Sequence, residues 1–219
     1  PPKGGSLNTK QKEILRMWIA QGVDFGNWVG ATDGLKNLAE RIKSNKLPQA
    51  SYLIEYDQLA EGVQSVEKAV INEIAQKTNL MVRPLGVGSV LLEAKVVTEP
   101  GVVNDQSVKL RMPIKQNIVK VDLRKTSITD KSLQMLSTFP RLTHLNLMGT
   151  AVDSSSVKYL NGNVSLEALN MVDTEVSEDI IETLLSMSSL EKVYLWESEF
   201  TPAGISDLKK RANSLQVSF

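Results

Sequence analysis

A 24-residue repeat between Ile118 and Phe200 constrains the fold of this chain more than any other feature. Four copies carry the apolar pattern L-x-x-L-x-L, whose repeated positions are Ile118, Leu142, Leu166 and Leu190, then Val121, Leu145, Leu169 and Val193, then Leu123, Leu147, Met171 and Leu195. Each copy continues with a hydroxyl residue and then an apolar residue, at Thr126, Thr150, Thr174 and Ser198 and at Ile128, Val152, Val176 and Phe200. Such a hydroxyl can hydrogen-bond backbone groups left unpaired where a strand ends.

The second half of each copy has the features of a short helix. A residue that favours the N-cap position recurs at one phase, as Thr129, Asp153, Ser177 and Thr201, and Pro202 follows at a first helical position. Apolar residues then return at helical spacing, for example at Leu133 and Leu136. A single strand-helix unit cannot bury its own apolar face, so the copies must stack. The sequence therefore predicts an α/β solenoid with short parallel strands on the concave side and helices on the convex side.

The four copies resemble the leucine-rich repeat family, in its 24-residue type with threonine where other types place Asn or Cys. The resemblance covers residues 118–219. Less regular copies are expected before it, with one strand at Leu92, Ala94 and Val96 and a first one at Leu80, Val82 and Leu85. Leu215–Phe219 is expected to form a closing strand, which begins early, about 22 residues after Val193.

Residues 1–77 show helical patterns without the repeat. Three helices are expected. The first ends at Gly22, and its apolar side carries Ile14, Leu15, Trp18 and Ile19. The second carries Leu35, Leu38 and Ile42, and the third runs to about Thr78 and carries Val63, Val66, Val70 and Ile74. We therefore divide the chain into residues 1–22, a helical linker or N-terminal cap at 23–78, and repeats at 79–219.

The first 22 residues carry a second resemblance. Pro1-Pro2-Lys3-Gly4-Gly5, followed by a helix with Trp18-Ile19-x-x-Gly22, resembles the tail of the cytochrome domain in bacterial c-type cytochrome proteins that end in leucine-rich repeats; those proteins pair it with a Tyr-Leu-Trp strand, and Tyr194-Leu195-Trp196 stands here. The resemblance implies haem c in a longer electron-transfer protein and a periplasmic or cell-surface location. It also implies that the Trp18 helix has lost its packing partner, so we expect Trp18 to repack on the repeats or to mediate self-association.

Composition excludes several classes of function. The 25 basic and 25 acidic residues cancel, which disfavours binding to nucleic acid, and no apolar run is long enough to span a membrane. The chain has no cysteine, so it can attach no haem c itself, and it has one histidine, His144. We therefore expect no cofactor in this chain and no enzymatic activity.

On a leucine-rich solenoid, the residues between the buried strand positions face the concave side, in neighbouring copies about 5 Å apart. This predicts three columns, which are Lys120, His144, Ala168 and Lys192, then a middle column of Asp122, Asn146, Asn170 and Tyr194, then an exit column of Arg124, Met148, Val172 and Trp196. The candidate binding residues among them are Arg124, His144, Asn146, Met148, Asn170, Tyr194 and Trp196. Tyr, Trp, Met and Arg are enriched at protein interfaces, so the prediction is a non-enzymatic module that presents a surface to a protein partner or to its own cytochrome domain.

Three alternatives remain open. Tyr194 and Trp196 can simply cover the last repeat of a structural spacer that orients the cytochrome, and a hydrolase-like site would need His144 beside a carboxylate in a closed pocket. Four carboxylates at matching phase after the strands could hold a hard cation such as calcium, although a solvated acidic edge is the commoner arrangement. These weak metal candidates are Asp173, Glu175, Glu197 and Glu199.

Overall fold

The computed structural model describes Thr9 and residues 51–86, 88–212 and 214–219. The chain divides into two compact units, Pro1–Ile54 and Glu55–Phe219. The predicted helices at Trp18 and at Leu35–Ile42 lie outside the described residues. Within the described part, no helix has the length and apolar character needed to cross a bilayer.

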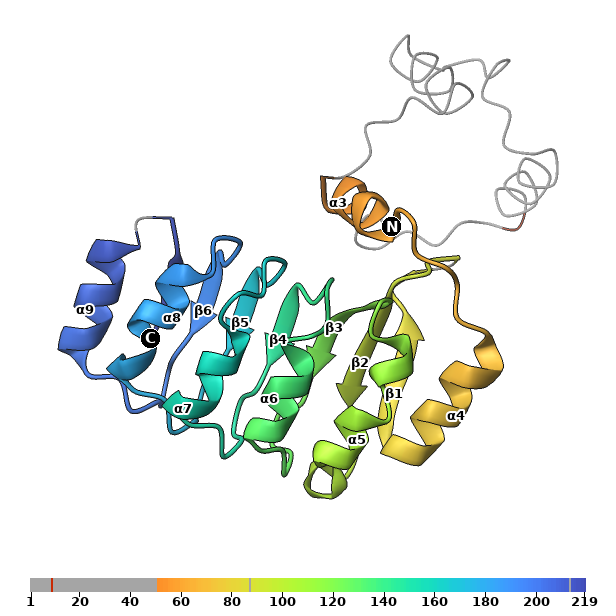
Figure 1. Cartoon of the computed structure of the whole chain (residues 1–219), viewed down its shortest axis with the longest axis horizontal. Coiled ribbons are helices and arrows are strands. Elements are labelled where there is room, and N and C mark those ends of the chain that lie inside the picture. Colours follow the sequence, from red (N-terminus) through yellow and green to blue (C-terminus); the bar gives the residue numbers. More distant parts are fainter. Residues whose placement is uncertain (1–8, 10–50, 87, 213) are drawn as a thin grey trace, which may run out of the picture. The chain divides into compact units, whose positions relative to one another are not determined.

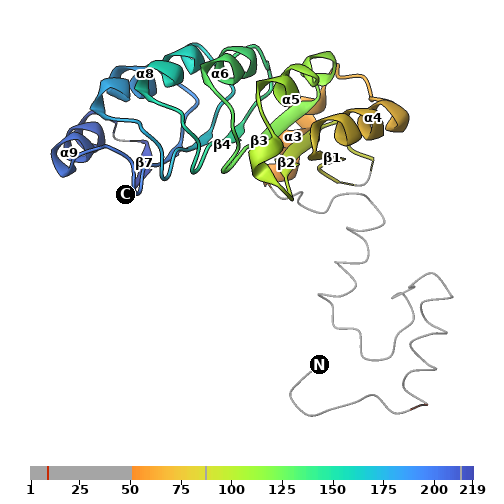
Figure 2. The ribbon, with the colours of Figure 1, turned by 90° about the horizontal axis from the view of Figure 1, so that it is seen from below.

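The unit Glu55–Phe219 is built on one seven-stranded sheet whose strands follow one another in sequence order (Figure 1). The strands are β1 (Leu80–Pro84), β2 (Leu92–Val96), β3 (Ile118–Asp122), β4 (His144–Asn146), β5 (Ala168–Asn170), β6 (Lys192–Tyr194) and β7 (Gln216–Ser218). All neighbouring pairs from β2 to β7 are parallel. Figure 2 shows the strands on the inner side of an arc and α5, α6 and α8 on its outer side. The predicted α/β leucine-rich solenoid is confirmed.

Short helices connect the strands on the convex side. They are η1 (Pro100–Val102), α5 (Asp105–Lys109), η2 (Met112–Ile114), α6 (Asp130–Leu136), α7 (Ser154–Val157), η3 (Lys158–Leu160), η4 (Glu178–Ile180), α8 (Ile181–Ser186) and α9 (Pro202–Arg211). Two further helices, α3 (Ser51–Ala60) and α4 (Lys68–Thr78), precede the sheet. Several are single 3-10 turns, because each copy has few residues to cross from one strand to the next.

The strand-exit hydroxyls act as the sequence predicts. The side chains of Thr126, Thr150, Thr174 and Ser198 each donate a hydrogen bond of 2.6 Å to the carbonyl of the residue three positions earlier. Three of the four predicted N-caps are also confirmed, since the side chains of Thr129, Asp153 and Thr201 accept from backbone N–H groups of the following turn. Ser177 is the exception and makes no capping bond, because its hydroxyl pairs with that of Ser154 and its turn is a 3-10 helix.

The N-terminal end of the solenoid differs from the prediction in three ways. β1 is antiparallel to β2, so it is a hairpin strand and not a first repeat. The connection, residues 85–91, is too short for the crossover that a parallel pair requires. The helix predicted from Val63 begins only at Lys68, and α3 was not expected at all.

Arg111 joins α4 to the first repeat. Its side chain is 2% exposed, and its guanidinium donates to the hydroxyl of Thr78, at 2.7 Å, and to the carbonyl of Ser107. Both acceptors lie in the last turns of helices, where partial negative charge favours a cation. Burial lowers the pKa of Arg111 to about 10. Because α4 also contributes Ile71 and Ile74 to the core, the compact unit starts before the repeats.

The C-terminal strand keeps the repeat length. Val217 of β7 is the partner of Val193 in β6, 24 residues earlier. The expectation of an early closing strand was therefore wrong, because Leu215 precedes the strand and Val217 holds the repeated position.

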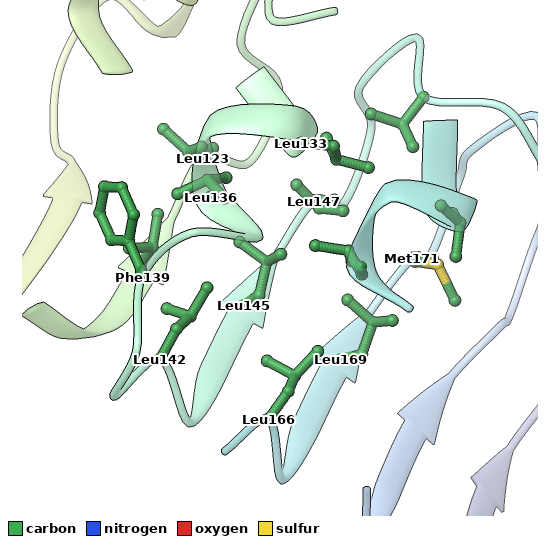
Figure 3. Packing of buried hydrophobic residues seen from close by; sticks show 14 of the residues in the cluster. Leu123, Leu133, Leu136, Phe139, Leu142, Leu145, Leu147, Leu166, Leu169 and Met171 are labelled. Atoms are coloured by element: carbon green, nitrogen blue, oxygen red, sulfur yellow. The ribbon is translucent and has the colours of Figure 1, made fainter. Parts of the chain in front are cut away.

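The core is a stack of the repeated apolar positions. Leu142, Leu145 and Leu147 of one copy lie directly beside Leu166, Leu169 and Met171 of the next, as Figure 3 shows, and all six are at most 2% exposed. Phe139, also fully buried, fills the space before β4. Each copy thus covers the apolar face of its neighbour.

We expect Thr150→Val to destabilise the unit by about 1 kcal/mol, because it removes a buried hydrogen bond at nearly constant volume. Thr138→Val is a matched control. Its hydroxyl makes the same bond to a carbonyl three residues earlier, but in an exposed position, so its effect should stay within about 0.5 kcal/mol. Urea unfolding measures both, and equal effects would contradict the importance of the hydroxyl column.

Candidate functional site

The strand register places the predicted concave columns side by side. Lys120, His144, Ala168 and Lys192 are successive partners across β3 to β6, and so are Asp122, Asn146, Asn170 and Tyr194. Successive side chains of a strand point to opposite faces, and the alternation of buried and accessible residues along each strand shows that these side chains point away from the core. The concave face is therefore the surface that the sequence predicts.

A hollow of about 410 Å³ lies on this face. It brings together five of the seven candidate binding residues, namely Arg124, His144, Asn146, Asn170 and Tyr194. Further polar groups at its wall are Glu93, Lys95, Lys120, Asp122 and Lys192. Met148 and Trp196 do not line it and follow at the strand exits. The sequence placed Lys120 and Lys192 in the right column, but only the structure shows that they border this hollow.

The middle column supports the backbone as well as facing solvent. The side-chain oxygens of Asp122, Asn146 and Asn170 accept hydrogen bonds of 3.0–3.2 Å from the backbone N–H two residues later. These bonds hold the chain as it leaves each strand, like the Asx turns of other loops. Because each oxygen accepts one of these bonds, the NH₂ groups of Asn146 and Asn170 are the parts of the amides that can donate to a ligand.

Arg124 is held in place by its own strand. Its Nε donates to both carboxylate oxygens of Asp122 at 3.0 Å, and the same carboxylate raises the pKa of Arg124. The sequence predicted Arg124 to be an available contact. The structure instead gives a neutralised pair in which the guanidinium is half-exposed.

His144 is neutral at physiological pH. Burial lowers its pKa to about 4, and the nearby positive charges of Lys120 and Lys192 add to this effect. The Thr143 hydroxyl donates to the Val119 carbonyl at 3.1 Å and lies 2.8 Å from His144 Nδ1. Since a hydroxyl has one proton, both contacts are satisfied when Nδ1–H donates to Thr143, which leaves Nε2 as an acceptor.

This environment does not favour a hydrolase-like site at His144. A general base works best with a pKa near the working pH, and a value of about 4 makes the imidazole a weak base at neutrality. The charged groups that shift its pKa are lysines and not the carboxylate that the catalytic hypothesis requires.

The four candidate metal ligands do not form a cation site. Among the described residues, no three acidic or histidine side chains gather in a metal-binding group. Asp173 and Glu197 adopt left-handed backbone conformations at matching phase, with φ of 55°. Gly149 occupies the same phase, and Asp173 Oδ2 lies 3.4 Å from the position that a Cβ on Gly149 would take. Asp173 is thus directed toward the preceding copy.

The start of the compact unit also contacts this region. Lys120 Nζ lies 5.3 Å from the centre of the Tyr56 ring, and Arg141 Nε donates to the Leu59 carbonyl at 2.9 Å. These contacts could not be predicted from the sequence, because no periodic signal marks α3.

Comparisons with known proteins add little to this description. No model of a protein family matches the chain, and no curated protein matches it. Among solved structures, the chain is similar to the crystal structure of an internalin, InlF, from Listeria monocytogenes, with 16% identity and a TM-score of 0.33. The similarity covers 49% of this chain and 36% of the internalin. None of these findings bears on the cytochrome resemblance, which stays a prediction.

We expect acid to destabilise the unit partly through His144. The folded pKa is lowered below the unfolded value of 6.5, so the unfolded state takes up the proton first. The contribution is complete above pH 6.5 and is lost as the pH falls toward 4. Because the ring is partly exposed, we expect wild type to lose about 1 kcal/mol more than His144→Gln between pH 7 and pH 4.

Urea unfolding at several pH values measures this difference, and the NMR titration of the imidazole gives the folded pKa directly. The signal is unambiguous, since the chain has one histidine. Lys120→Gln should raise that pKa by removing a nearby positive charge. A folded pKa at or above 6.5 would contradict the account.

Proposed function

We propose that this chain is a non-enzymatic protein-interaction module whose concave face contacts a protein partner. One observation carries the proposal. Tyr194 and Trp196 remain 38% and 58% exposed on this face, although Val193 of β6 and Leu169 of the neighbouring β5 are fully buried. Large exposed aromatic side chains are the residue types that dominate binding energy at protein interfaces.

The surroundings of these aromatic residues support the same conclusion. The exit column also contains Met148 and Val172, both half-buried, so that Trp196 continues an apolar row. The adjacent column offers the Asn146 and Asn170 amide groups. An apolar centre with polar groups at its margin is the usual composition of an interface.

The alternative is a structural spacer, in which Tyr194 and Trp196 only cover the last repeat. Their exposure favours the interaction module, because a covering role would bury them. In either case, we propose from the resemblance of residues 1–22 that the module belongs to a longer bacterial electron-transfer protein. The haem c would be held elsewhere in that protein, which would be periplasmic or on the cell surface.

A natural sequence with Cys-x-x-Cys-His and a Met upstream of Pro1 would support this origin.

Sedimentation velocity at several protein concentrations tests the related proposal that the Trp18 helix mediates self-association. Trp18→Ser should then shift a concentration-dependent dimer to monomer, and a wild-type monomer at all concentrations would contradict it.

We expect the double variant Tyr194→Ala, Trp196→Ala to bind the partner of the full-length protein at least tenfold more weakly than wild type. Affinity purification with quantitative mass spectrometry compares this variant with wild type. Tyr159→Ala is the matched control, since Tyr159 is an equally exposed aromatic residue, at 42%, but lies in η3 on the convex side. A partner retained by the double variant, or lost with Tyr159→Ala, would favour the spacer.

A further inference from the structure

The concave face carries a row of positive charge across the strands. Lys120 and Lys192 lie in one column, with His144 and Ala168 between them. Ala168 has the smallest side chain in this column, which leaves room between the flanking residues, and all four line the 410 Å³ hollow. An anionic group placed there would meet a lysine on either side.

A second hollow continues this surface toward the exits of β2 and β3. It measures about 400 Å³ and shares Lys95 and Arg124 with the first, so these two side chains form the wall between them. Its other residues are Met81, Val96, Val97, Pro100 and Lys125, of which Val97 is 60% exposed. The second hollow is therefore apolar with a basic margin.

The charges of the two hollows do not balance internally. Five basic side chains line them, against the two carboxylates of Glu93 and Asp122. Asp122 forms an ion pair with Arg124. Glu93 forms ion pairs with Arg83 and, at 4.0 Å, with Lys95. No ion pair within the described residues involves Lys120, Lys125 or Lys192. The chain is neutral as a whole, so this surplus is local.

Acidic residues at the strand entrances restrict where an anion can extend. Burial and the neighbouring carboxylates of Glu191 and Glu55 raise the pKa of Glu167, while Lys120 and Lys192 act in the opposite direction. A negatively charged ligand at the lysine row would be repelled on that side. It would therefore run toward the strand exits and the second hollow.

We propose that the two hollows bind an extended acidic peptide segment of the partner. Its carboxylates would contact Lys120 and Lys192, its backbone carbonyls would accept from the Asn146 and Asn170 amides, and an apolar side chain would enter the second hollow. This inference rests on the proposed interaction function and names the chemistry of the partner. A polyphosphate chain fits less well, because the apolar residues of the second hollow offer it no contact.

The test uses a fluorescein-labelled peptide of alternating Glu and Leu, about eight residues long, which as an extended chain spans the strands from β2 to β6. Fluorescence anisotropy measures its binding to the full chain. We expect a Kd that rises with salt and that weakens at least tenfold in the double variant Lys120→Gln, Lys192→Gln. The matched control is Lys158→Gln with Lys209→Gln, which removes two exposed lysines from the convex side and should leave binding unchanged.

NMR provides an independent readout that a general loss of stability would not mimic. A carboxylate bound between the lysines should raise the pKa of His144 in wild type, and this rise should be absent in the double lysine variant. Circular dichroism checks that both double variants remain folded.

Three results would overturn the inference. They are no binding of the peptide, equal affinity for a peptide with Gln in place of Glu, and tighter binding of an oligothymidylate of equal charge. Any of these results contradicts the acidic-peptide proposal. If the variant with Tyr194→Ala and Trp196→Ala nevertheless fails to bind the partner of the full-length protein, the proposed interaction function still stands.

Discussion

The burial of leucine-type side chains between neighbouring copies is the interaction on which this structure depends. A copy has one strand of three to five residues and one or two helical turns, too little to enclose a core. Leu145 is buried only because the adjacent copies cover it from both sides, and the same holds for Leu169. Stacking at a fixed repeat length is therefore a condition of folding. The hydroxyl column and the helix caps satisfy the backbone groups that this stacking brings out of water.

The same constraint separates the residues that fold the chain from those free to serve its function. Alternate strand positions are fixed as apolar, while the positions between them face the concave side and need only tolerate a strand. Asp122, Asn146 and Asn170 show an intermediate case, since each supports the backbone with its oxygen. Tyr194 takes this phase in the last complete copy and Trp196 follows it. Their exposure has no explanation in packing, which is why they support the proposed interface.

Sequence reasoning succeeded where periodicity carries the information. The strands from β3 to β6, the buried positions and the hydroxyl column all follow from the repeat. It failed where single contacts decide. The direction of β1 depends on a short connection, and the availability of Arg124 depends on its pairing with Asp122. Arg111 and Tyr56 act across distances that no local pattern records. For the site, the columns were predictable, but the two hollows and their surplus of positive charge were not.

The central claim is that the concave face contacts a partner, and photo-crosslinking tests it most directly. A benzoylphenylalanine is placed at Ala168, between His144 and Lys192 on the concave face, and separately at Val164, an exposed loop residue that precedes β5. The experiment uses the full-length protein in its native cells. We expect a defined protein adduct from Ala168 and none from Val164. An adduct from Val164 alone, or from neither position, would contradict the account.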